Sequence, residues 1–422
     1  FVPVVLILYF LAPDQLRNAV LLVASLLFYA WGEPKYIILM IVSILLGYLF
    51  GILIERYRGT GWSKVFLSGS VLSGLGLLAY FKYANFFIEN YDQLTGQKTG
   101  LLKIALPVGI SFYTFQILSY TIDVYRGEVK AQRNLILMAT YVALFPQLIA
   151  GPIVRYIDVE TELKSRQVTL EKVFLGIRRF IIGLSKKVLI ANALGELCGI
   201  FEASAEKSVV FYWIYGIAFS LQIYFDFSGY SDMAIGLGKI FGFHFLENFN
   251  YPYMSKSITE FWRRWHISLG SWFRDYLYIP LGGNRGSFKK WLFNIALVWM
   301  LTGLWHGAAW NFILWGLLFA LLLILEKVWL GQILKKLPGM VAHLYVLFFV
   351  MLSFVLFNAK DLTEAVTDIR GVLGFLAIPL VTAETFYYLR SYGVILVLAI
   401  VGATPFFKQL IRRVNTKVVG AN

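Results

Sequence analysis

One ionisable side chain, His306, lies inside the uncharged stretch from Trp291 to Leu325. A neutral imidazole can take up a proton near neutral pH, because its ordinary pKa is about 6.5. An ionisable group within such an apolar segment is costly and usually faces a protein interior or a cavity. His306 therefore indicates either a proton-handling site or a structural histidine that joins two helices by hydrogen bonds, and its position leaves both interpretations open.

The stretch that holds His306 is too long for a single membrane crossing. As one straight helix, its roughly 35 residues would extend about 52 Å, whereas a bilayer core is about 30 Å thick. We expect a break or bend near Gly303 and Gly307, which flank the histidine. The loop at 282–290 carries three basic residues and is expected to be cytoplasmic, which puts His306 about 24 Å of helix rise from that surface.

A second histidine, His266, lies in the segment SITEFWRRWHISLGSWFRDYLYIPLGGNR at 257–285. Ser257 followed three residues later by Glu260 is a capping-box pattern, which marks the start of a helix. Proline and glycines close the segment, so the sequence predicts a helix over 258–279.

On that helix four residues would share one face: Trp262, His266, Gly270 and Phe273. His266 would then look out between aromatic rings across a glycine gap. Arg263 and Arg264 would occupy adjoining rows, near a lipid headgroup or an anionic ligand. An interfacial amphipathic helix with aromatic anchors explains the same pattern without chemistry.

Other candidate residues carry weaker signals. Asp226 lies at the end of a hydrophobic segment in DFSGYSDM, where a cavity role and a solvated loop are both open. The single cysteine, Cys198, excludes an internal disulfide, and with no paired histidine motif on a helix we predict no metal site. We interpret His244 and His343 as packing residues. Nucleotide-binding glycine loops and the nucleophile-elbow motif are absent.

The composition requires a membrane environment. Of 422 residues, 59% are hydrophobic and 15% are charged, with a mean hydropathy of +0.70. Seven uncharged runs approach or exceed the roughly 18–20 residues that cross a bilayer: 36–54, 65–81, 104–122, 134–154, 208–225, 337–359 and 391–407. We predict an all-α polytopic membrane protein with about 11 membrane helices and additional short interfacial and re-entrant helices.

The remaining organisation is simple. The chain opens on an apolar Phe1 without an initiator Met, so we expect the true start to be missing, and no secretory signal is evident. Without repeats or long linkers, residues 1–422 are predicted to form one membrane domain whose catalytic centre spans about 104–325. The net charge of +14 is explained by basic cytoplasmic loops and by contact with anionic lipids, so no nucleic-acid partner is expected.

Five motifs together resemble the membrane-bound O-acyltransferase family, in its bacterial alginate O-acetyltransferase-like branch. The first is the segment 257–285 quoted above. The others are LVWMLTGLWHGAAWNFILWGL at 297–317, FPQLIAGPIVRY at 145–156, YFDFSGYSDMAIGLG at 224–238 and NFNYPY at 248–253. The resemblance implies a ring of membrane helices around a thinned centre, where a tunnel joins a cytoplasmic donor to an acceptor from the other face.

The resemblance also assigns residues. The family's hallmark histidine in a Trp-His-Gly context falls on His306, and its second position, a histidine or asparagine, falls on His266. We expect His306 to act as catalytic base, kept neutral by burial, and His266 as a second catalytic or orienting residue. The expected substrate-binding residues are Trp305, Asn311, Trp262, Arg263, Arg264 and Asp226.

The implied reaction is one half of an acetyl relay. A cytoplasmic acetyl thioester, acetyl-CoA or an acyl-carrier thioester, would give its acyl group within the bacterial cytoplasmic membrane, with no tightly bound cofactor. A separate extracytoplasmic acetyltransferase partner would finish O-acetylation of an exported polysaccharide. Two alternatives remain at this point: D-alanyl transfer to teichoic acid from a carrier protein, and a non-enzymatic transporter of glycan or acyl lipid in which the histidine relays protons.

Overall fold

A computed structural model describes residues 1–410 and 413. This described part consists of helices and connecting turns, with no β-strand, and confirms the predicted all-α fold class. Its packing divides into two compact units. Unit 1 comprises residues 1–181 and 231–247, and unit 2 comprises residues 182–230 and the described residues from 248 onward. The prediction of one membrane domain stays a prediction.

Unit 1 holds the N-terminal helices. They are α1 (Val2–Leu11), α2 (Arg17–Gly32), α3 (Ile37–Arg56), α4 (Gly61–Leu78), α5 (Ala84–Thr95), α6 (Ile110–Arg126), α7 (Leu135–Ala143), α8 (Phe145–Leu148), α9 (Tyr156–Lys164) and most of α10 (Leu170–Ser185). Short 3-10 and π turns, η1 (Asp14–Leu16) and η2 (Ala79–Tyr83), adjoin α2 and α4. The end of α12 (Val209–Ile240) also belongs to this unit.

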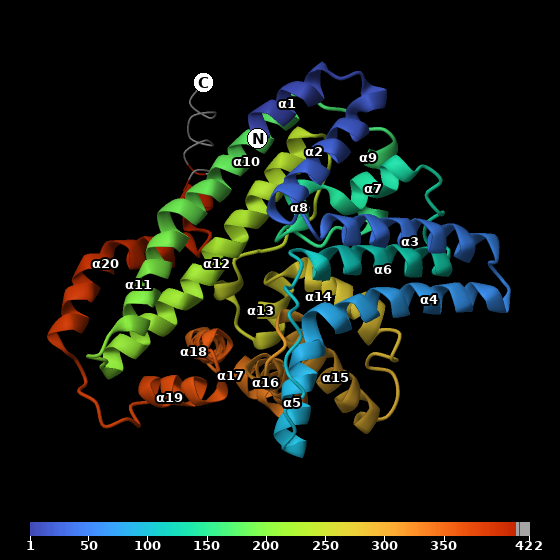
Figure 1. Ribbon diagram of the computed structural model, residues 1–422. Coiled ribbons are helices and arrows are strands. Elements are labelled where there is room, and N and C mark those ends of the chain that lie inside the picture. The colour runs from blue at the N-terminus through green and yellow to red at the C-terminus, as the bar shows by residue number, and fades with distance from the viewer. Residues whose placement is uncertain (411–412, 414–422) are drawn as a thin grey trace. The chain divides into compact units, whose positions relative to one another are not determined.

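Three helices of unit 1, α3, α4 and α6, pack side by side (Figure 1). Helix α6 begins after a turn at 108–109, in which Gly109 has a left-handed φ of +76°. Its side chains are buried almost throughout, including Gln116, Thr121 and Asp123. Protein therefore surrounds these groups instead of lipid.

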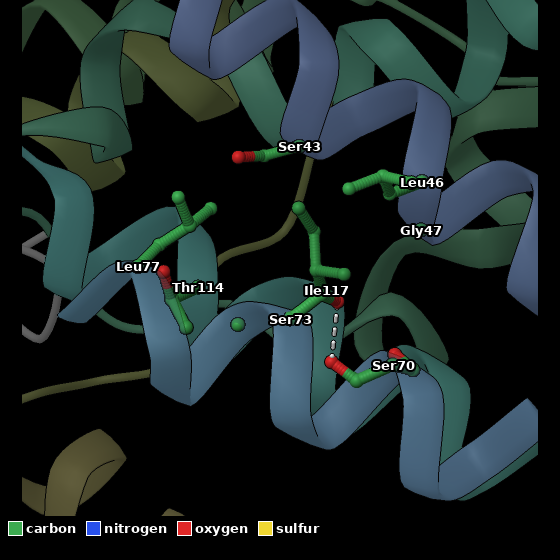
Figure 2. Close-up of a pocket in the computed structure, with 9 residues that line it drawn as sticks. Ser43, Leu46, Gly47, Ser70, Ser73, Leu77, Thr114 and Ile117 are labelled. Carbon is green, nitrogen blue, oxygen red and sulfur yellow. Dashed lines mark hydrogen bonds between the residues drawn. The ribbon is translucent and has the colours of Figure 1, made fainter. Parts of the chain in front are cut away.

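A small cavity lies among α3, α4 and α6 and is lined by Ser43, Gly47, Ser70, Ser73 and Thr114 among others (Figure 2). The Ser73 hydroxyl donates to the Ser70 carbonyl at 2.9 Å, and the Ser70 hydroxyl donates to Thr121 at 3.0 Å. Its volume of about 20 Å³ is room for about one water. The cavity is therefore a packing detail and cannot hold an acyl donor.

Unit 2 holds the C-terminal helices. They are α11 (Asn192–Ala203), the first part of α12, α13 (Ile258–Arg264), α14 (Ile267–Phe273), α15 (Phe288–His306), α16 (Trp310–Leu325), α17 (Gly331–Lys336), α18 (Gly339–Asn358), α19 (Leu362–Val372) and α20 (Ala383–Gly402). The short turns between them are η3 (Lys186–Ala191), η4 (Pro252–Met254), η5 (Arg274–Tyr278) and η6 (Glu326–Leu330). In Figure 1, α16 and α18 lie side by side in orange, in agreement with their packing.

Within the described residues, 6 helices are long and apolar enough to cross a membrane: Ile37–Arg56, Gly61–Thr95, Val209–Ile240, Trp310–Lys336, Gly339–Asn358 and Ala383–Gly402. The predicted number of about 11 is therefore not confirmed. The prediction of a membrane-crossing segment at 134–154 is wrong, because α7 ends at Ala143 and the short α8 follows. Pro146 has no N–H to donate to the Val142 carbonyl and its ring would clash with a continuous helix, so the chain leaves the helical region at Leu144 before α8 begins.

Candidate active site

The predicted helix over 258–279 is interrupted at its centre, which corrects the sequence interpretation. Ser257 caps α13 by accepting a hydrogen bond from the Glu260 amide at 3.0 Å, as the capping pattern predicts. Helix α13 then ends at Arg264, and His266 has a left-handed backbone with φ of +44°. The expected face of Trp262, His266, Gly270 and Phe273 is therefore broken between its first two members.

The segment around Asn248 holds this break open. The Asn250 amide donates to the Arg264 carbonyl at 2.9 Å, and the Ile267 amide donates to the Asn248 carbonyl at 3.0 Å. The Ser268 amide donates to Oδ1 of Asn248 at 3.1 Å. These bonds take up main-chain groups that a continuous helix would pair internally, so a distant segment replaces the helical hydrogen bonds that are lost.

His266 occupies a closed aromatic environment. The residue is 2% exposed, and its ring centroid lies 4.6 Å from that of Phe227 and 6.1 Å from that of Trp305. Nδ1 lies 3.2 Å from Oδ1 of Asn248. Burial lowers the pKa of His266 well below its ordinary value, and the nearby His306 lowers it further. His266 is therefore neutral, and the two predicted histidines lie close enough to influence each other.

His306 lies at a helix end, as the length of its apolar stretch predicts. Helix α15 ends at His306, Gly307 is extended, and α16 begins at Trp310. Two glycines bring these helices into main-chain contact: a Cβ at Gly303 would lie 2.1 Å from the Phe312 carbonyl oxygen, and one at Gly316 would lie 2.2 Å from the Trp299 carbonyl oxygen. This close approach fixes His306 beside the start of α16.

Three aromatic rings surround His306. Its ring centroid lies 5.0 Å from that of Trp305, 5.1 Å from Trp315 and 5.3 Å from Phe357. His306 is partly buried, whereas His266 is almost completely buried.

Asn311 links α16 to the C-terminal end of α18, beside His306. Its amide Nδ2 donates to the Ala359 carbonyl at 2.9 Å, with a longer contact of 3.5 Å to the Phe357 carbonyl. Both partners are carbonyl oxygens, so the amide orientation is fixed and Oδ1 faces away from them. Asn311 is 3% exposed, and this arrangement holds Phe357 against His306.

Four buried polar atoms in this region have no hydrogen-bond partner within the described residues. They are the acceptors Nε2 of His266 and Oδ1 of Asn311, and the indole donors Nε1 of Trp262 and Trp315. Trp262 packs against Trp315 at 5.6 Å between ring centroids. Buried polar atoms are rarely left unpaired, so the region has both donors and acceptors available for a polar ligand.

The other predicted site residues have different surroundings. Arg264 is bound by Glu260, with Nε to Oε1 at 3.0 Å, while Arg263 is exposed. Asp226 lies within α12 and forms an ion pair with Lys187 of η3, so it is neither at a helix end nor in a loop. These three residues do not contact the histidines through any described interaction, whereas Trp262, Trp305 and Asn311 join the aromatic region.

The two remaining histidines lie elsewhere. His244 is an exposed residue of unit 1 whose amide donates to Glu162 at 2.9 Å. Nδ1 of His343 lies 3.1 Å from the Ser255 carbonyl. Among the described residues, no three His, Cys, Asp or Glu side chains gather in a way that could hold a metal ion.

Sequence reasoning missed Asn248, Phe227, Trp315 and Phe357. Asn248 opens the NFNYPY motif and Phe227 lies in the DFSGYSDM motif, so both stood within segments already singled out. Trp315 lies in the motif at 297–317, whereas Phe357 carried no signal beyond hydrophobicity. The roles of both depend on how α16 and α18 pack.

Comparisons with known proteins identify the family of the chain. The sequence profile of the MBOAT, membrane-bound O-acyltransferase family matches residues 128–364. The chain is 43% identical to the probable alginate O-acetylase AlgI of Azotobacter vinelandii over 370 residues, which is 86% of this chain and 74% of that protein. It is 33% identical to the peptidoglycan O-acetyltransferase of Helicobacter pylori over 97% of this chain and 85% of that protein.

A more distant similarity joins the chain to the teichoic acid D-alanyltransferase of Bacillus subtilis, with 32% identity over 51% of this chain and 58% of that protein. The family match includes Asn248, His266, His306 and Asn311, and the chain is multi-pass with several apolar helices. Membership of an acyltransferase family favours an enzyme over the non-enzymatic transporter alternative. The chain is therefore a membrane O-acyltransferase that belongs to the membrane-bound O-acyltransferase family, in its alginate O-acetylase-like branch.

Proposed function

We propose that this enzyme moves an acetyl group from a thioester on the cytoplasmic side of the bacterial inner membrane to an acceptor hydroxyl reached from the opposite side. The donor is acetyl-CoA or an acetylated carrier protein. A separate extracytoplasmic acetyltransferase then completes O-acetylation of an exported polysaccharide. The names of the Azotobacter and Helicobacter relatives support acetyl as the transferred group and a cell-envelope polymer as its destination.

The observation that carries the proposal is the meeting of His266 and His306 in one aromatic region with unpaired buried donors and acceptors. The acceptor hydroxyl oxygen attacks the thioester carbonyl carbon while its proton passes to His306. The carbon–sulfur bond then breaks, and the departing thiolate takes the proton from His306, which returns to its neutral form. Such a base contributes about 10²–10⁴ in rate.

The remaining residues receive supporting roles. Trp305 and Trp262 form walls around the reacting groups, and Oδ1 of Asn311 accepts a hydrogen bond from substrate. Arg263, whose side chain is exposed, is the better of the two arginines for a donor phosphate, because Glu260 occupies Arg264. We retain Asp226 as a weaker candidate, since Lys187 already pairs with it.

The test measures labelled acetyl in membranes that contain intact protein, His306→Ala or the matched control His244→Ala at equal abundance. Acetyl-CoA is supplied outside inverted vesicles, and label is followed into polymer. We expect transfer to disappear in His306→Ala and to persist in His244→Ala, whose side chain is exposed. Equal transfer in both variants would overturn the role of His306.

The same membranes distinguish the D-alanyl alternative. A D-alanyl carrier thioester replaces acetyl-CoA in a parallel reaction with teichoic acid as acceptor. Transfer of D-alanine without transfer of acetyl would replace the proposed donor while leaving the acyltransferase assignment intact.

A further inference from the structure

The orientation of the Asn248 side chain is fixed by its neighbours. The Asn248 atom beside His266 also receives hydrogen bonds from the Ser268 amide at 3.1 Å and the Ser268 hydroxyl at 2.9 Å. A main-chain N–H can only donate, so the atom that it meets must be the carbonyl oxygen of Asn248 and not the amide nitrogen. Asn248 is also completely buried, so no solvent competes for that oxygen.

This orientation determines which nitrogen of His266 carries hydrogen. Nδ1 of His266 lies 3.2 Å from the Asn248 oxygen, and an oxygen that only accepts requires a donor there. A neutral imidazole has one N–H. The hydrogen is therefore on Nδ1, and Nε2 presents a lone pair on the opposite edge of the ring. That Nε2 is buried and has no partner within the described residues.

One group that can use this lone pair belongs to His306, which lies close enough to His266 to act on it electrostatically. Both imidazoles border the ring of Trp305, with centroid distances of 6.1 Å for His266 and 5.0 Å for His306. His306 ends its helix and is only partly buried, so its side chain is not enclosed on every side. Hydrogen bonds in catalytic sites are often long before substrate binds.

We propose that Asn248 is a positioning residue that fixes His266 as the Nδ1–H tautomer, so that Nε2 of His266 accepts a hydrogen bond from one nitrogen of His306 in the substrate-loaded enzyme. The other nitrogen of His306 is then unprotonated and faces the acceptor hydroxyl. The hydroxyl proton moves to that nitrogen as the oxygen–carbon bond forms. This inference rests on the proposed function, in which His306 is the base.

The tautomer itself is measured without any activity. The full-length protein in nanodiscs, with ¹⁵N-labelled histidine, is studied by solid-state NMR, and the His266 signals are assigned by their loss in His266→Asn. We expect a hydrogen directly bonded to Nδ1 in the wild type and mixed tautomers in Asn248→Ala. A hydrogen on Nε2 in the wild type would overturn the inference, as would an unchanged Nδ1–H signal in Asn248→Ala.

Kinetics test the connection to His306. Asn248→Ala is expected to slow acetyl transfer by about 10- to 100-fold, as do other losses of a hydrogen bond that orients a histidine. In an enzyme that already carries His266→Asn, Asn248→Ala should cause no further loss of rate, because both changes break the same chain of hydrogen bonds. The matched control Asn192→Ala in α11, with an exposed side chain, should keep wild-type rates. Full additivity of Asn248→Ala and His266→Asn would refute the relay.

A conservative variant separates positioning from packing. In Asn248→Asp the carboxylate still accepts from Nδ1–H and Ser268, so transfer is expected to survive. Its charge raises the pKa of His266, and protonated His266 cannot accept a bond from His306, so the acidic limb of the pH–rate profile moves to higher pH. An unshifted limb in an active Asn248→Asp enzyme would contradict the proposal. If neither the wild type nor any variant transfers acetyl but the NMR result holds, the proposed function fails and the positioning of His266 stands.

Discussion

The main-chain contact between α15 and α16 makes a quantitative prediction for Gly316→Ala. The added Cβ would lie 2.2 Å from the Trp299 carbonyl oxygen and 3.0 Å from its carbon. Restoring an ordinary contact requires the helices to separate by about 1 Å. The Trp299 carbonyl cannot rotate aside, because it is a main-chain group within α15. Overpacking of this kind costs about 1–3 kcal/mol of folding free energy.

The same separation acts on catalysis, because His306 is carried by α15 whereas Trp315 and Asn311 are carried by α16. A displacement of about 1 Å in a positioned group can reduce a rate by about 10²-fold. We expect Gly316→Ala to lower the thermal unfolding midpoint in detergent and to lower acetyl transfer more steeply than its loss of folded protein explains.

The matched control is Gly393→Ala in α20, where an added Cβ meets nothing within 4 Å. Alanine there should be neutral or stabilising by up to about 1 kcal/mol, because it has the higher helix propensity. The reasoning would be refuted if Gly316→Ala unfolded and turned over like the wild type, or if both alanine variants lost equal stability.

Two further predictions concern stability. Burial lowers the pKa of His266 in the folded protein. Below about pH 6.5 the unfolded chain therefore binds a proton that the folded chain does not. The free energy of unfolding consequently falls as pH decreases through that value. In His266→Asn, which suits a left-handed backbone, the unfolding midpoint should depend less on pH between about 7.5 and 5.5, and an equal dependence would argue against this assignment. In unit 1, Arg179 binds Asp232 at 2.6 Å and Glu247 at 2.5 Å. Arg179→Leu should therefore destabilise the protein by about 1–3 kcal/mol, measured by thermal unfolding, and Asp232→Asn should recover part of this loss; no recovery would assign the effect to packing instead.

Local patterns were sufficient to predict the end of α15. The apolar stretch exceeded one bilayer crossing, and Gly303 and Gly307 offered places for the chain to break. The break follows directly after His306, so the sequence located a catalytic candidate at a helix end. The pattern of its own segment singled out His266, and the resemblance of the motifs to a known family assigned it a catalytic or orienting role.

Local patterns could not predict the interruption at His266. Residues 258–279 carry a good cap and a helical spacing, and nothing near Trp265 forbids a helix. The break exists because main-chain and side-chain groups of residues 248–250 bind across it. Such competition depends on a distant segment, which a periodicity of 3.6 residues does not register. The burial of His266 and its bond to Asn248 followed from the same contact.

The segment 248–250 also separates two tasks within the site. Main-chain bonds on both sides of the break, at Arg264 and Ile267, hold the backbone of His266 in place. Wall side chains on these helices can therefore change in size while His266 keeps its position. Acceptance of larger or smaller acyl groups can evolve, or be engineered, by remodelling walls such as Trp262 without rebuilding the histidine pair.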